Sequence, residues 1–258
     1  MRAVHVTYYT DPASPRSWAG EPALRRVLTR FGEGVSISYV MGGLARSIDD
    51  PLRMLRDVLD AAADSAMPVD PRLWLEQPPL STYPSCLGVK AAAEQGLDVP
   101  FLRRAREGFM CERRRLCQSE ALVDLARTID GLDVRRFAVD LYSDAIVESF
   151  SADLERTQAA GGSDGGAPGL PFVAVEGVDG LHAVAGLEEL VERAGAQAAG
   201  PAPGVEAALR RFGRMATPEV AAVCELPGPL AEAELWRLAA QWKVRAQRTL
   251  GGELWAAA

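Results

Sequence analysis

The stretch that most constrains this chain is D-P-A-S-P-R-S-W-A-G-E-P, which spans Asp11–Pro22 and directly follows the apolar run Val4–Tyr9. A short run of β-branched and aromatic residues that ends in Asp-Pro predicts a strand. Ser14 is then a suitable N-cap, and Pro15 a suitable first residue, of a following helix. Because a helix N-terminus presents free backbone N–H groups and positive potential, this strand-to-helix junction is the first candidate site and suits a bound anion.

The segments around this junction predict a β-α-β opening and a late hairpin. Apolar residues recur at helical spacing over Ala19–Phe31, and alternation over Val35–Met41 predicts a second strand. Strands connected in this way are expected to be parallel. Further along, Leu170–Val175 and Leu181–Ala185 flank a Gly-Val-Asp-Gly turn and predict an antiparallel hairpin, which a helix over Leu187–Ala194 follows.

Between these two groups of strands, every periodic segment from about Asp49 to Gln158 is helical, which predicts an inserted helical domain. The predicted helices and turns are Pro51–Ser65, Pro71–Glu76, Pro84–Gln95, Val99–Leu116, Gln118–Ile129, Val134–Ser143 and Ile146–Ala159. The glycine-rich segment 161–169 is expected to be a plain connector rather than a mobile loop.

The end of the chain predicts a separate module. Residues 195–204 are rich in Ala, Pro and Gly and read as a linker. Beyond it, Val205–Arg214, Thr217–Cys224 and Ala231–Trp242 are predicted helices, with Thr217 as a cap, and a strand-like end follows. This order resembles a reduced winged-helix unit. Its seven basic and six acidic residues form no DNA-binding footprint, so a docking or dimerisation module is expected.

Composition excludes several classes of function. Twenty-eight basic against 35 acidic residues give a net charge of −7, which disfavours nucleic-acid binding. No apolar run approaches a membrane span, and the N-terminus has no signal-peptide pattern, so we expect a cytoplasmic protein. With only His5 and His182, a histidine-based metal site is not expected. The spacing of the cysteines indicates no disulfide framework: Cys86, Cys111, Cys117 and Cys224.

The first strand, the turn of the form D-P-x-[C/S]-P-x-[C/S]-W and the late Leu170-Pro171 resemble the DsbA-like branch of the thioredoxin superfamily. This branch includes the kappa-class glutathione transferases and the 2-hydroxychromene-2-carboxylate isomerases. The resemblance, which covers about residues 1–194, implies an α/β, thioredoxin-like core over residues 1–48 and 159–194 and a helical insertion over 49–158. The small C-terminal helical, winged-helix-like module over 205–258 lies outside it. The resemblance also implies a cis Leu170–Pro171 bond that faces the junction, an arrangement that is rare in general.

Serines stand where the dithiol members of this branch have two cysteines, at Ser14 and Ser17. A helix N-terminus and its neighbours can lower a cysteine pKa from about 8.5 to roughly 3.5–7.5. The same helix end supplies at most about 2 kcal/mol, which leaves a serine un-ionised. Ser14 can therefore donate a hydrogen bond to a thiolate or oxyanion, or it is only a helix cap.

The segment Phe101–Leu116 is the sharpest charge feature, with six arginines against two glutamates. A solvated helix face and a site for an acidic ligand or partner both fit this pattern.

The resemblance implies, as the first hypothesis, a non-redox enzyme that isomerises a conjugated double bond, of the cis-trans type, on a small or carrier-protein-bound substrate. No cofactor is required, although a thiol such as glutathione could assist, and a homodimer is left open. The candidate catalytic residues are Ser14, Ser17 and Asp11. The candidate substrate-binding residues are Trp18, Tyr83, Arg103, Arg113, Leu170 and Pro171. The first alternative is a catalytically silent, protein-binding adaptor. The second is a thiol oxidoreductase or glutathione transferase-like enzyme, with Cys86 or Cys111 as the reactive thiol in a one-cysteine form.

Overall fold

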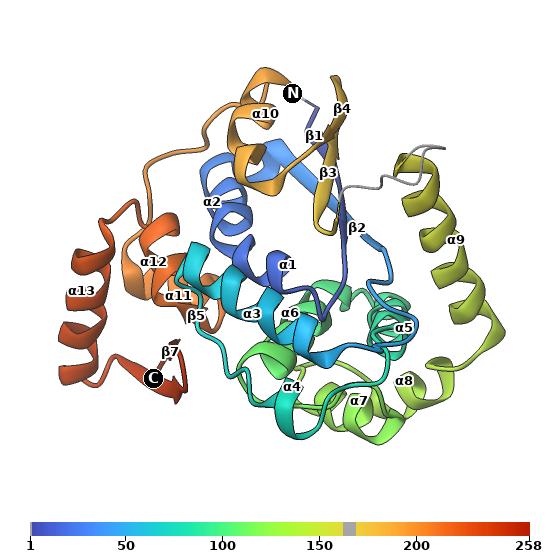
Figure 1. Ribbon diagram of the computed structural model, residues 1–258. Coiled ribbons are helices and arrows are strands. Elements are labelled where there is room, and N and C mark those ends of the chain that lie inside the picture. Colours follow the sequence, from blue (N-terminus) through green and yellow to red (C-terminus); the bar gives the residue numbers. More distant parts are fainter. Residues whose placement is uncertain (1, 162–168) are drawn as a thin grey trace.

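Strand β1 (Val4–Thr10) occupies an interior position in a four-stranded sheet of order β2-β1-β3-β4. In the computed structural model, which describes residues 2–161 and 169–258, β2 (Val35–Met41) runs parallel to β1. Strand β3 (Phe172–Val175) pairs antiparallel with the other edge of β1, and β4 (Val178–His182) completes the hairpin. The predicted parallel pair and the predicted antiparallel hairpin are both confirmed, and with them the thioredoxin-like α/β core (Figure 1).

Three helices belong to this core: α1 (Pro15–Ala19), α2 (Glu21–Phe31) and α10 (Leu187–Arg193). The apolar face of α2 packs with α10 and the sheet in one buried cluster. The predicted helix over Ala19–Phe31 is interrupted at Gly20, which caps α1 and precedes α2. Pro22 explains the interruption, since a proline has no N–H to donate in a helix interior but is tolerated in the first turn.

Seven helices form the predicted insertion: α3 (Pro51–Ser65), α4 (Leu73–Glu76), α5 (Tyr83–Ala93), α6 (Asp98–Met110), α7 (Ser119–Ala126), α8 (Val134–Asp140) and α9 (Asp144–Gly161). Helix α6 ends well before the predicted Leu116. The N–H groups of Cys111 and Glu112 both donate to the Glu107 carbonyl, and Arg113 takes a left-handed φ of 54°. No glycine or proline announces this turn, so the sequence pattern did not predict it.

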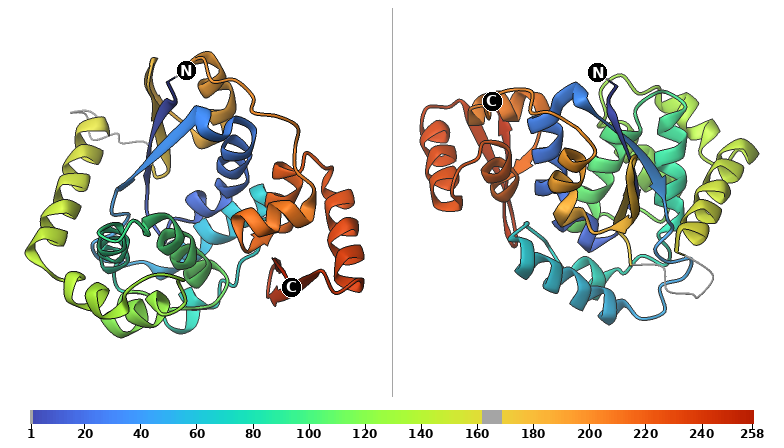
Figure 2. Two further views of the ribbon diagram at one scale, coloured as in Figure 1. Left: turned by 180° about the vertical axis from the view of Figure 1, so that it is seen from behind. Right: turned by 90° about the horizontal axis from the view of Figure 1, so that it is seen from above.

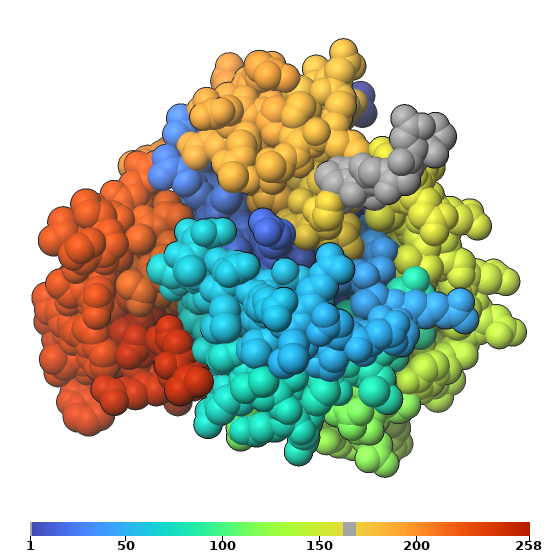
Figure 3. All heavy atoms as spheres, in the orientation of Figure 1, coloured from blue at the N-terminus to red at the C-terminus, as the bar shows by residue number. Residues whose placement is uncertain are grey.

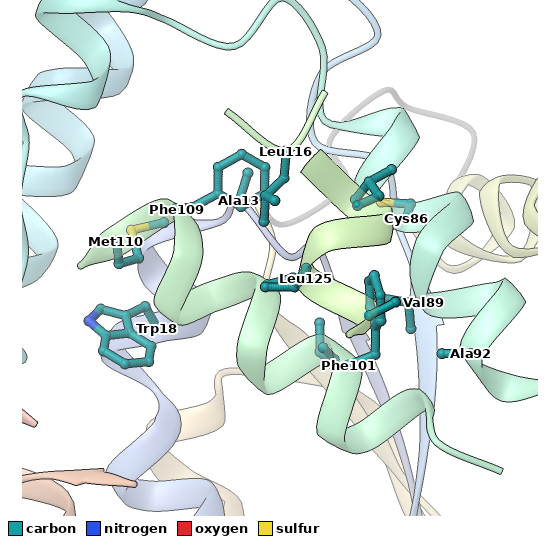
Figure 4. Packing of buried hydrophobic residues seen from close by; sticks show 14 of the residues in the cluster. Ala13, Trp18, Cys86, Val89, Ala92, Phe101, Phe109, Met110, Leu116 and Leu125 are labelled. Carbon is teal, nitrogen blue, oxygen red and sulfur yellow. The ribbon is translucent and has the colours of Figure 1, made fainter. Parts of the chain in front are cut away.

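A large apolar cluster connects the insertion to the first junction. Figure 4 shows Trp18 beside Met110 and Phe109 of α6, while Cys86 and Val89 of α5 lie on the other side of that helix. The junction is therefore held by the core of the insertion as well as by the sheet. The predicted glycine-rich connector lies, apart from its two end residues, outside the described residues.

The C-terminal segment contains α11 (Val205–Phe212), α12 (Thr217–Val223) and α13 (Gly228–Ala240), and an antiparallel sheet of order β5-β7-β6. Its strands are β5 (Met215–Ala216), β6 (Val244–Thr249) and β7 (Gly252–Ala257). Thr217 is not the predicted cap. The N-cap of α12 is Ala216, whose N–H donates to Glu219, while Thr217 Oγ1 accepts from Trp255 Nε1 at 3.0 Å. The winged-helix resemblance and the division into domains stay predictions.

Buried ion pairs join α2, α6 and α12. Arg103 Nη1 lies 3.1 Å from Glu21 and 2.9 Å from Glu219, and its Nε lies 2.8 Å from Glu107. Arg25 Nε lies 2.9 Å from Glu219, which is fully buried. Figures 1 and 2 show α12 (orange) lying beside α2 (blue) at this place. Charges from three distant parts of the sequence thus neutralise one another away from water.

Further pairs surround this centre. Arg106 pairs with Glu21 and is only 1% exposed. Glu112 accepts from Arg104 Nη2 at 3.1 Å and from Arg214 Nη2 at 2.8 Å. Within the described ranges, no helix is both long and apolar enough to cross a membrane.

Replacing Glu219 with alanine tests the ion-pair network. We expect Glu219→Ala to lower the free energy of unfolding by about 3–5 kcal/mol, because it removes the fully buried carboxylate that Arg25 and Arg103 share and leaves their buried charges incompletely paired. Glu232→Ala, which removes an exposed carboxylate from α13, is the control and should change stability by about 0.5 kcal/mol at most. Urea unfolding followed by circular dichroism measures both. Equal stabilities of the two variants would contradict the role of the network.

Glu21 predicts how stability depends on pH. Burial alone would raise its pKa, but Arg106, Arg103 and Arg25 together lower the pKa of Glu21 to about 2. Since the folded-state pKa lies below the unfolded value, the stabilisation is complete above about pH 4.5 and is lost as the pH falls towards 2. The loss should be about 3 kcal/mol. Glu21→Gln should flatten this acid limb in urea unfolding, whereas Glu148→Gln, at an exposed site on α9, should keep it.

Candidate functional site

The junction is built as the sequence predicts. Ser14 is the N-cap of α1, and its Oγ accepts a hydrogen bond from the N–H of Ser17 at 3.2 Å. The Leu170–Pro171 peptide bond is cis, and Ser14 Oγ donates to the Leu170 carbonyl at 3.3 Å. The predictions of a cap, of a cis proline and of their proximity are confirmed.

The tip of α1 is closed by its neighbours. Ser14 is 1% exposed, Leu170 is 8% exposed, and Asp11 and Ser17 are fully buried. Five clefts were found in the part of the chain that the structure describes, and none of the four residues just named lines any of them. With five residues, α1 is also too short to hold an anion at its N-terminus by itself. The anion site expected from the sequence is therefore filled by the protein's own groups.

The Asp11 carboxylate is an internal anchor. Its oxygens accept from the N–H groups of Ala13 and Leu44, each at 2.7 Å, from Thr82 Oγ1 at 2.7 Å and from Cys86 Sγ at 3.3 Å. Burial raises the pKa of Asp11, and these hydrogen bonds oppose the rise. They connect the end of β1 to the loop after β2 and to the start of α5. The geometry gives Asp11 a structural task, and its catalytic role stays a prediction.

Ser17 lies at the end of a buried polar chain. Thr10 Oγ1 donates to Ser17 Oγ at 2.8 Å and accepts from Arg106 Nη2 at 2.6 Å. Arg106 in turn pairs with Glu21. Ser17 is thus linked to the ion-pair network and has no free side to present to a substrate.

The aromatic candidates are packing residues in this structure. Trp18 is 1% exposed, and its Nε1 donates to the carbonyl of Pro68 at 2.9 Å. The guanidinium carbon of Arg103 lies 4.5 Å from the Trp18 ring centroid, within cation–π range. Tyr83 is half-buried at the start of α5 and packs edge-on against Phe150, with ring centroids 5.0 Å apart.

The two arginines predicted to bind substrate are engaged elsewhere. All the N–H groups of Arg103 point to acceptors on Glu21, Glu107, Glu219 and the Arg214 carbonyl. Its guanidinium therefore has no donor left for a ligand. Arg113 is 42% exposed and lies 2.9 Å from Glu76.

The cysteines are not poised as nucleophiles. Cys86 and Cys111 are buried, and burial raises the pKa of both thiols. Their hydrogen bonds to Asp11 and to the Pro68 carbonyl further hold them as thiols. Reactive cysteines have lowered pKa values and are accessible, so a one-cysteine redox role finds no support in this geometry. Among the described residues, no group of three or more His, Cys, Asp and Glu could hold a metal ion.

Sequence reasoning missed the residues that hold the junction in place. Thr10, Thr82 and Arg106 each bond directly to a candidate catalytic side chain or to its partner. Arg106 had a detectable signal, since it lies four positions after Leu102 and so shares the apolar face of α6. The threonines had none, because a lone threonine at the end of a strand or before a helix is common.

Figure 3 shows part of α1 (dark blue) in a shallow depression between α3 (light blue) and the segment of β3, β4 and α10 (yellow to orange). Arg16 is exposed on α1, whereas the serines on either side of it are buried. The surface above the junction is therefore open and shallow, unlike the enclosed apolar pocket that binds a small substrate.

Comparison with known proteins identifies the core. A family model described as Thioredoxin matches residues 8–161. The "ClpXP adapter protein SpxH" of Halalkalibacterium halodurans is 28% identical over 172 residues, which is 61% of this chain and 55% of that protein. The chain thus spans about half the length of this relative. The protein of the same name from Shouchella clausii is 24% identical over 98% of this chain and 88% of its own length.

Solved structures share the fold. A putative protein disulfide isomerase from Nitrosomonas europaea superimposes with a TM-score of 0.63 at 18% identity, over 74% of this chain and 97% of that one. A probable DsbA oxidoreductase from Streptomyces coelicolor gives a TM-score of 0.60 at 20% identity, over 74% and 89% of the two chains. At this level of identity the likeness concerns the fold alone.

These relatives correct one prediction. A small-molecule or carrier-bound substrate was expected as the partner, and this is wrong, because the matched curated relatives are named as adapter proteins, which bind proteins. The open surface over a closed junction agrees with that correction. Since the family model covers more than half of the chain and the sheet, the junction and the cis proline are those expected of this fold, the chain belongs to the thioredoxin family.

Proposed function

We propose that this chain is a protein-binding adaptor on a DsbA-like thioredoxin fold, which brings a client protein to ClpXP. The proposal rests on its relatives, which bear the name ClpXP adapter protein. The structural observation that supports it best is the hydrogen bond from Ser14 to the Leu170 carbonyl. In this fold, the space between these two groups is where a substrate thiol would approach, and here it is closed.

The chemistry around this contact agrees with binding without turnover. A general acid or base must reach the proton that it transfers, within hydrogen-bond distance of the substrate. Asp11, Ser14 and Ser17 are buried and already bonded to protein groups. We propose that the binding function requires no cofactor, since the interaction of two protein surfaces needs none.

An adaptor works through effective concentration. When one molecule holds both a client and ClpXP, the client is presented at a local concentration on the order of millimolar, although the free concentrations are far lower. Such a molecule must be present in the right amount, because an excess places the client and ClpXP on different copies.

The host cell offers the first test. Protein half-lives after translation arrest would be compared in the wild type, in a strain without this chain and in a strain without ClpX. A client should be stabilised in both deletion strains, because its degradation needs both proteins. If no protein is stabilised in both deletion strains, the adaptor proposal is contradicted.

Reconstitution gives the second test. With purified client and ClpXP, the rate of client degradation should rise with added chain, pass through a maximum and fall again in excess. The fall separates an adaptor from an enzyme that modifies the client, for which the rate would reach a plateau. A plateau, or no acceleration, would count against the proposal.

Ser14→Ala separates the adaptor from an enzyme that uses Ser14. We expect unchanged acceleration of degradation and a loss of about 1 kcal/mol in the free energy of unfolding, the usual cost of an N-cap. The assay is the same reconstitution, with urea unfolding alongside. Loss of acceleration in a variant that remains folded would show that Ser14 itself acts on the client.

A further inference from the structure

A cleft of about 510 Å³ opens where α2, α6 and the end of α11 meet, away from the cis-proline junction. Its walls combine an apolar surface with an unusual number of arginines. The apolar residues include Leu24, Leu28, Val99, Leu102, Ile129 and Phe212. The arginines are Arg25, Arg103, Arg104, Arg106, Arg211 and Arg214.

The charge of this cleft is opposite to that of the whole chain. Six arginines face three carboxylates in the lining, those of Glu21, Glu107 and Asp130. Arginine remains in excess, six to five, when the neighbouring partners Glu112, which is half-buried, and Glu219, which is buried, are added. The chain as a whole has a net charge of −7. The cleft therefore carries a small excess of positive charge on an acidic molecule, which favours an anionic ligand.

One buried donor in the lining has no acceptor. Arg106 is 1% exposed, and its two terminal nitrogens are used by Glu21 and Thr10. Its Nε–H finds no partner anywhere in the described part of the chain. An unpaired buried donor costs about 1–3 kcal/mol. A carboxylate that entered the cleft would supply the missing acceptor.

We propose that this cleft binds an acidic segment of a partner protein, with a carboxylate directed to Arg106 and a neighbouring apolar side chain on the Leu28 and Phe212 side. This inference rests on the proposed adaptor function and specifies the chemistry of one of its partners. Charge complementarity selects the acidic residue, and the apolar lining selects its neighbour. The unpaired Nε–H of Arg106 can donate one charge-assisted hydrogen bond to a carboxylate oxygen.

Nuclear magnetic resonance of the ¹⁵N-arginine-labelled full chain tests the cleft directly. The probe is the peptide acetyl-Leu-Asp-Phe-amide, and its matched control is acetyl-Leu-Asn-Phe-amide, which lacks only the charge. We expect the Arg106 Nε–H resonance, assigned by its loss in Arg106→Lys, to shift saturably with the acidic peptide and not with the neutral one. Equal shifts with both peptides, or none, would overturn the proposal.

Two exposed valines provide matched variants. Val99 lines the cleft and is 48% exposed, whereas Val147 lies on α9, outside the cleft lining, and is 44% exposed. Val99→Glu places a competing carboxylate at the cleft and should weaken binding of the acidic peptide at least tenfold, whereas Val147→Glu should leave it unchanged. Wild-type affinity in Val99→Glu would overturn the assignment. Full displacement of the peptide by an equal concentration of inorganic phosphate would also overturn the assignment, because the cleft would then be a general anion site.

The degradation assay separates this proposal from the one on which it rests. If the wild type and Val147→Glu accelerate client degradation by ClpXP and Val99→Glu does so at least fivefold less, both proposals hold. Full acceleration by Val99→Glu would refute the cleft and keep the adaptor. Peptide binding by a wild-type chain that accelerates no degradation would refute the adaptor function and, with it, the partner assigned to the cleft.

Discussion

The guanidinium of Arg103 is the point on which the rest of the structure depends. It meets carboxylates from α2, α6 and α12 and stacks on Trp18 of the junction, so that four separate segments share one buried charge. Burying an ion pair adds little net stability, because the desolvation cost is close to the Coulombic gain. Removing one partner is costly, however. The network therefore selects one arrangement of helices over others, rather than adding to the total free energy of folding.

The same logic explains the closed junction. The hydroxyls at the junction bond inwards, from Ser14 to the Leu170 carbonyl and from Thr10 to Ser17. A carboxylate that could have served as a base is held by four donors. The junction has the geometry of the thioredoxin-like fold, and its polar groups bond to other groups of the protein. What remains for interaction is the surface above the junction, and the proposed adaptor function would use that surface.

Much of this could be predicted from the sequence, for local reasons. Strand alternation, the Ser14-Pro15 cap and the Leu-Pro ahead of a strand are signals carried within a few residues. The buried ion pair of Arg103 with Glu219 was not predictable, because Glu219 lies more than a hundred positions away in the sequence. A run of arginines also usually indicates a solvated helix face. Likewise, the end of α6 depends on backbone bonds to Glu107 that no residue type announces. Local patterns specified the helices and strands, whereas contacts between residues far apart in the sequence determined which side chains of the candidate site are already bonded within the protein.

The position of Glu219 has a consequence for how this molecule is divided. Composition alone predicts a domain boundary in the Ala/Pro/Gly-rich residues 195–204, and a shortened chain designed from the sequence would end there. Yet the carboxylate at 2.9 Å from Arg25 of the first β-α-β unit, that of Glu219, comes from beyond that boundary, while Glu21 of the same helix lies farther away, at 3.5 Å. Without residues 205–258, Arg25 and Arg103 would lose both the Glu219 carboxylate and the helix that covers them, so a chain cut at this boundary would not keep the packing described here.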